Sequence, residues 1–87
     1  MSDDETIVEI DASTATVEKR NIAFNAMVGD DISKFLLSIA DFAAFGVENP
    51  KADPVGSVAA VSSSLEKLIR EKARKNDLSA TTRLEAF

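Results

Sequence analysis

The chain contains no cysteine and no histidine. Their absence excludes thiolate nucleophiles, disulfide bonds and most zinc, haem and iron–sulfur sites, and it removes the commonest general base. Tyrosine and tryptophan are absent as well, so five phenylalanines make up the whole aromatic content. We expect little catalytic chemistry from such a composition.

Glycine is also scarce, with only Gly29, Gly46 and Gly56. These positions match no phosphate-binding loop and no dinucleotide-binding fingerprint. The carboxylates that could serve catalysis are adjacent or scattered among expected caps and loops: Asp30, Asp31, Asp41, Glu48 and Asp53. The sequence therefore predicts a protein that is not an enzyme and that uses no cofactor, no metal ion and no small-molecule substrate.

Long apolar runs are missing too. A membrane-spanning helix needs roughly 18 uninterrupted apolar residues, and polar side chains interrupt the richest segment, 32–47. No export signal is apparent. We expect a protein of the cytoplasm, or of a particle assembled there, without membrane contact. A chain of 87 residues has room for one core of marginal stability, which association with other chains would reinforce.

Negative charge is concentrated at the start of the chain. The net charge is −5, and residues 1–11 contain five acidic residues and no basic residue. Thr6, Val8 and Ile10 alternate with the residues between them, a period of two that suits a short strand or extended segment. We therefore expect residues 1–13 to form an acidic extended arm. Its contact residues are Asp3, Asp4, Glu5, Ile7, Val8 and Ile10.

Apolar or small residues recur in steps of three and four from residue 17 to residue 42, as on one side of a helix. These positions are Val17, Asn21, Phe24, Val28, Ile32, Phe35, Ile39 and Phe42. The spacing predicts a helix over about 14–45, with residues 11–16 as the turn and cap that precede it. Gly29, followed by two aspartates, either bends this helix or separates two helices. Alternatively, residues 22–28 form a strand, because their apolar residues also alternate.

A second helix is predicted over about 54–75. Gly46 ends the first helix, and Asn49-Pro50 cannot continue it. Asp53-Pro54 supplies a cap and a first-turn proline. The apolar seam beyond it contains Val55, Val58, Val61, Leu65 and Leu68. We expect a mainly α fold, in which an antiparallel helical hairpin or small helical bundle carries the arm and a short C-terminal helix within residues 76–87.

Apolar side chains on segment 32–45 wrap around more of the expected helix than one partner helix could cover. They are buried either by the arm and the tail within one copy, or in an interface with other copies. The predicted core or interface residues are Phe24, Val28, Ile32, Phe35, Ile39, Phe42, Phe45, Val58, Val61, Leu65 and Leu68. Leu84 and Phe87 are the predicted contact residues of the tail.

A basic cluster lies near the end of the second predicted helix. It contains Lys67, Arg70, Lys72, Arg74 and Lys75. Such a cluster is typical of a solvated helix end whose cations complement the helix dipole. It could also receive the acidic arm of the same or a neighbouring chain. Nucleic acid is not an expected partner, since the chain is acidic overall and shows no basic stripe elsewhere.

These features favour a small self-associating structural or assembly protein, a subunit of a homo-oligomer or of a larger particle such as a phage or other virion. In this hypothesis a Phe-rich helix packs between copies, and the arm and tail contact neighbours. The alternative is an acidic inhibitor or adaptor that binds another protein, for instance by mimicking nucleic acid. The expected partners are accordingly copies of the chain or another protein.

Overall fold

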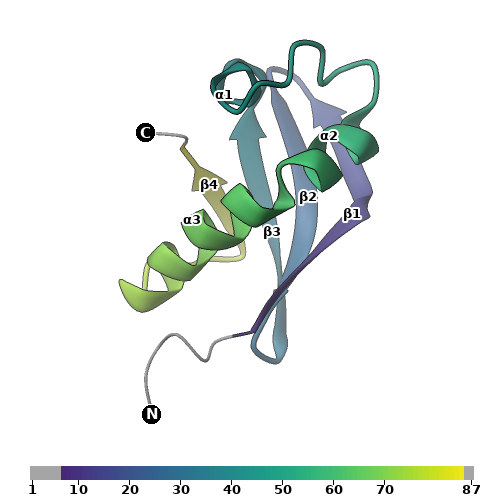
Figure 1. Ribbon diagram of the computed structural model, residues 1–87. Coiled ribbons are helices and arrows are strands. Elements are labelled where there is room, and N and C mark those ends of the chain that lie inside the picture. The colour runs from purple at the N-terminus through teal and green to yellow at the C-terminus, as the bar shows by residue number, and fades with distance from the viewer. Residues whose placement is uncertain (1–6, 86–87) are drawn as a thin grey trace.

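The computed structural model describes residues 7–85 and contains a four-stranded mixed sheet with three helices (Figure 1). Strands β1 (Val8–Glu18), β2 (Asn21–Val28) and β3 (Asp31–Ser38) form an antiparallel meander. Helices α1 (Ile39–Ala44), α2 (Pro54–Ala60) and α3 (Ser62–Arg74) follow. Strand β4 (Thr81–Leu84) then pairs parallel with β3, which gives the strand order β1-β2-β3-β4.

Two tight loops connect the meander. Residues 19–20 join β1 to β2, and residues 29–30 join β2 to β3. A two-residue hairpin loop of this kind needs a positive φ at its first position, which glycine adopts without steric cost. Gly29 has φ +63°, and Lys19 holds the same position of the first loop with φ 58°.

The predicted helix over 14–45 is wrong, and so is the mainly α fold class built on it, because most of this segment belongs to β1, β2 and β3. The alternative that residues 22–28 form a strand is right. Steps of three and four placed Ile32 and Phe35 on one helix face. In the sheet they lie on opposite faces, and their exposed fractions are 70% and 0%.

The beginning and the end of the chain also differ from the prediction. Residues 11–16, expected to be a helix-capping turn, form an irregularity within β1, where the pairing register with β2 shifts. The Thr14 hydroxyl donates to the Asp11 carbonyl (2.7 Å) and accepts from the Asn25 amide (2.8 Å), so it fixes this bulge. The expected C-terminal helix is instead the strand β4.

The second predicted helix exists in two pieces. Asp53 caps α2, because its carboxylate accepts from the Gly56 amide at 3.0 Å, and Pro54 occupies the first turn. The chain breaks at Val61 and continues as α3. Gly46 has φ +90° just beyond α1, as expected of a residue that ends a helix. No helix within residues 7–85 is long and apolar enough to cross a membrane.

The core lies between one face of the sheet and the helices, with α2 and α3 running diagonally across that face (Figure 1). Its largest fully buried side chains are Phe24, Phe35, Phe42, Ile22, Leu37, Leu65, Ile69, Leu84 and Val58. The rings of Phe24 and Phe35, which are cross-strand partners, stack with centroids 5.9 Å apart. One copy thus buries Phe24, Phe35 and Phe42 without a neighbour. Phe24 and Phe35 lie on strands, so the Phe-rich helix that was predicted to pack between copies does not exist.

Candidate functional site

The face of the sheet that points away from the helices carries polar and apolar side chains in ordered rows. We call it the open face. Paired residues of neighbouring strands lie on the same face, so the register aligns its side chains in rows. The row nearest the β2–β3 loop contains Glu9, Met27 and Ile32, and the next row contains Asp11, Asn25, Lys34 and Thr81.

Large apolar side chains are exposed at one end of the open face. Met27 and Ile32 are direct cross-strand partners, with exposed fractions of 38% and 70%. Ile7, 63% exposed, lies beside them, because its carbonyl accepts from the Gly29 amide at 2.8 Å. Single exposed apolar residues are ordinary, whereas contiguous exposed patches of several hundred Å² are typical of contact surfaces.

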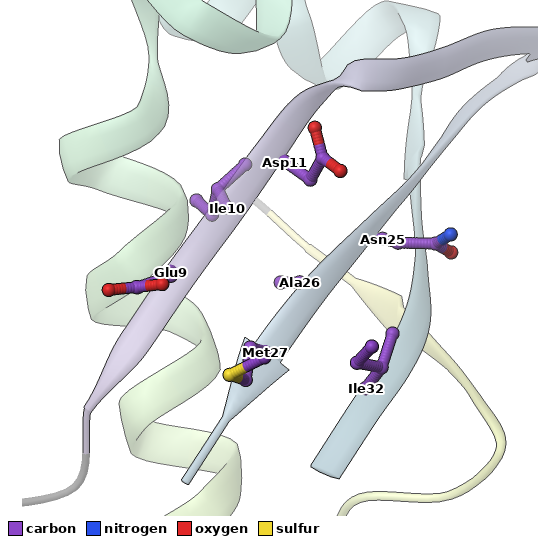
Figure 2. A pocket seen from close by; sticks show the side chains of 7 residues that line it. All are labelled: Glu9, Ile10, Asp11, Asn25, Ala26, Met27 and Ile32. Carbon is purple, nitrogen blue, oxygen red and sulfur yellow. The ribbon is translucent and has the colours of Figure 1, made fainter. Parts of the chain in front are cut away.

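A shallow hollow of about 360 Å³ lies beside these side chains (Figure 2). We call it the face hollow. Its residues come from three neighbouring strands: Glu9, Ile10 and Asp11 from β1, Asn25, Ala26 and Met27 from β2, and Ile32 from β3. The face hollow is therefore acidic along β1 and apolar at the β2–β3 end.

The rest of the open face carries basic groups toward β3. The Lys34 ammonium lies 2.8 Å from the Glu18 carboxylate, and both side chains are close to half exposed. Such an exposed pair contributes little to stability. The charges are instead distributed unevenly over the open face, with acidic residues along β1 and a basic residue on β3.

A second hollow, of about 630 Å³, lies at the end of the sheet that carries the β1–β2 loop. We call it the cationic hollow. Its residues are Lys19, Arg20, Asn21, Ser38, Ile39, Ala40, Lys51 and Arg83. Four cations from three separate places in the fold converge here: two adjacent residues of the β1–β2 loop, one of the α1–α2 connection and one of β4. Carboxylates are absent from this lining.

The predicted core and interface residues divide between the interior and the surface. Those buried in the interior are Phe24, Phe35, Phe42, Val58, Val61 and Leu65. Those partly buried against it are Val28, Ile39, Phe45 and Leu68. Ile32 alone of this set is a large exposed hydrophobic residue of the open face.

The predicted arm, cluster and tail are not brought together as one site. Val8 is buried in β1 and Ile10 is partly buried, while Asp3, Asp4 and Glu5 lie outside the described residues. The basic cluster lies along α3 and at its C-terminal end. The Lys72 ammonium lies 3.5 Å from the Asp77 carboxylate. The Arg70 Nε is buried without a hydrogen-bond partner among residues 7–85. Leu84 is buried in β4, and Phe87 falls outside the described range.

Sequence reasoning missed both hollows. Lys51 and Arg83 are far from Lys19 and Arg20 in the sequence, and only the sheet register and the α1–α2 connection bring them together. The adjacent pair Lys19-Arg20 was the one local signal.

Among residues 7–85, no group of three carboxylates could hold a metal ion. Comparisons with family models, with characterised proteins and with solved structures give no match for this chain.

Proposed function

We propose that the protein is a non-enzymatic association module that forms a two-fold dimer through its open face. The observation that carries this proposal is that a projecting apolar side chain, Ile32, and a matching depression, the face hollow, lie on one surface. A two-fold interface uses the same patch on both copies, so it requires projection and depression to be present together.

The sheet register gives the proposed arrangement. When two open faces stack about a two-fold axis parallel to β2, β1 of each copy lies over β3 of the other. Ile32 then enters the face hollow of the partner copy, and Met27 meets its own counterpart. Strand β4 remains outside the overlap. Packed sheets of this kind lie about 10 Å apart, with interdigitating side chains.

Charge supports the same stacking. With β1 over β3, the Asp11 carboxylate of one copy faces the Lys34 ammonium of the other, and the symmetry makes this pair twice. Opposite charges that meet across an interface fix its register and exclude wrong arrangements. An arrangement with β1 over β1 would place Glu9 and Asp11 over like charges, so it is disfavoured.

The edges of the sheet are poorly suited to association, which leaves the face. Strand β1 carries acidic side chains and the bulge at 11–16, and β4 has only four residues. Bulges, charges and short strands all discourage edge-to-edge pairing.

The overlap is small. Three strands of about 27 Å cover roughly 400 Å² per copy at ordinary strand spacing. A standard stable interface buries about 800 Å² per partner. We therefore expect a reversible dimer with a micromolar dissociation constant, a strength suited to a subunit that assembles with many copies. We also propose that assembly takes place in the cytoplasm. Fractionation of producing cells tests this location.

Sedimentation velocity over a series of protein concentrations tests the proposal. We expect a monomer–dimer equilibrium in the wild-type chain and a monomer at the same concentrations in Ile32→Glu, which places a carboxylate against Glu9 and Asp11 of the partner. The matched control is Val55→Glu, an equal change at an exposed valine of α2, on the other side of the molecule. This control should dimerise like the wild type.

A wild-type chain that stays monomeric, or a Val55→Glu variant that loses association as fully as Ile32→Glu, contradicts the proposal. A monomer would favour the alternative function, an acidic protein that binds a different macromolecule. Added salt separates the contributions further: it should weaken the dimer modestly by screening the Asp11–Lys34 pairs, whereas the contact of Ile32 persists.

A further inference from the structure

The cationic hollow concentrates positive charge in a protein that is acidic overall. The chain has 15 acidic and 10 basic residues, yet Lys19, Arg20, Lys51 and Arg83 line one depression without a carboxylate. Among residues 7–85 none of these four forms an ion pair. Like charges that converge in this way repel one another, and a bound anion would offset that repulsion.

Neutral polar groups in the same hollow narrow the chemistry of the ligand. The Ser38 hydroxyl oxygen accepts from the Asp41 amide at 3.1 Å, so its proton is free to be donated into the hollow. Asn21 also lines the hollow, and its side-chain amide has both donor and acceptor groups. A ligand hydroxyl can pair with either.

The walls and size of the hollow fit a small organic molecule. Ile39 and Ala40 provide an apolar side beside the polar groups. The volume, about 630 Å³, falls within the range of roughly 300–1,000 Å³ that is usual for small-molecule sites. We propose that the cationic hollow binds a sugar phosphate, either free or as part of a mononucleotide. The phosphate meets the cations, and a sugar hydroxyl hydrogen-bonds to the polar side chains of Ser38 and Asn21.

The β1–β2 loop places one of the four cations at the rim of the hollow. Lys19 holds the loop position with a positive φ, 58°, which a two-residue hairpin loop requires, and it lines the hollow.

Nucleic acid fits the surface less well than a small ligand. The cations surround one depression and do not form a stripe along which a phosphate backbone could run. The adjoining open face carries Glu9 and Asp11 on β1, which would repel such a backbone. In the dimer proposed above, β4 with Arg83 lies outside the overlap, whereas Asn21 and Ser38 belong to strands within it.

Amide NMR spectra of the full chain, titrated with ribose 5-phosphate, AMP, inorganic phosphate and ribose, test the proposal. We expect ribose 5-phosphate and AMP to shift the amides of residues 19–21 and 38–40 at millimolar concentration or below. Inorganic phosphate should bind more weakly, and ribose should leave these amides unmoved. The relative affinity of the two phosphorylated probes distinguishes a free sugar phosphate from a nucleotide.

Variants then locate the site. Arg83→Gln should weaken the tighter probe by about tenfold or more, because it removes a charge-assisted hydrogen bond. Arg74→Gln is the matched control, since Arg74 is exposed near the end of α3 and lies outside the hollow; it should bind like the wild type. Asn21→Ala should weaken ribose 5-phosphate while leaving inorganic phosphate unchanged.

Three outcomes overturn the proposal. The first is that no phosphorylated probe shifts the amides around the hollow while the spectrum shows a folded chain. The second is an equal loss of affinity in Arg83→Gln and Arg74→Gln. The third is that a single-stranded oligonucleotide shifts the same amides at much lower concentration than either small probe, which would assign the surface to nucleic acid.

Discussion

Replacing Phe35 by alanine should remove a large part of the stability of the fold. Phe35 is fully buried at the centre of β3 and stacks on Phe24. Truncation of a buried phenylalanine costs about 3–5 kcal/mol, because the apolar contacts are lost and a cavity remains. A chain of 87 residues has a free energy of unfolding of about 4–13 kcal/mol. The melting temperature should therefore fall by roughly 12–40 °C.

The informative comparison is with Ile32→Ala, three residues earlier on the same strand. Ile32 is 70% exposed on the open face, so its truncation removes few contacts. The remaining effect is the lower preference of alanine for a strand, which spans about 1 kcal/mol. On a helix these two residues would share one face and lose comparable stability.

Urea unfolding followed by far-ultraviolet circular dichroism measures both changes, since the chain has no tryptophan or tyrosine to report by fluorescence. Low protein concentration keeps self-association from contributing to the apparent stability. The free energy in water follows from linear extrapolation. Equal losses in Phe35→Ala and Ile32→Ala would refute the placement of these residues on opposite faces of a sheet.

Two further substitutions probe the connections of the sheet. Gly29→Ala should lower the free energy of unfolding by about 1–2 kcal/mol, because alanine is strained at φ +63°; a gain of about 1 kcal/mol, the value for a helix interior, would instead indicate a helix through residue 29. Thr14→Val should lower the free energy of unfolding by about 1–3 kcal/mol, because the Asn25 amide loses its acceptor. Thr16→Val, the same change at an exposed residue of β1, is its control, and an equal loss there would show that the Thr14 hydroxyl does not anchor the bulge.

Local signals in the sequence were sufficient to predict those helix ends that depend only on neighbouring residues. The Asp53-Pro54 pair predicts the start of α2 because a cap and a first-turn proline act within one turn. Gly46 likewise marks the end of α1, where the backbone φ is positive. These elements needed no information about distant parts of the chain.

The strands could not be predicted in the same way, because periods of two and of three to four coincide at several positions. Ile22, Phe24, Ala26 and Val28 alternate as β2 requires, yet Phe24 and Val28 also fit the helical spacing. Strand pairing with β1 and β3 decides between them, and that pairing is long-range. Strand β4 is four residues long with two threonines, too short to show a period.

The candidate sites depend even more on distant pairing. Ile32 was identified as apolar, but its exposure follows from the register with Met27 and Glu9. The cationic hollow needs Arg83 beside residues of the β1–β2 loop. The basic cluster found in the sequence was the contiguous one on α3, because only adjacent charges are visible without a fold.

The central claim is that the covered face of the sheet holds the molecule together and the open face joins two copies. A dilution series recorded by amide NMR tests it residue by residue. The amides of Glu9, Met27 and Ile32 should shift with protein concentration, while that of Val55 on α2 should stay constant. Shifts confined to the helices, or none at any concentration, would contradict it.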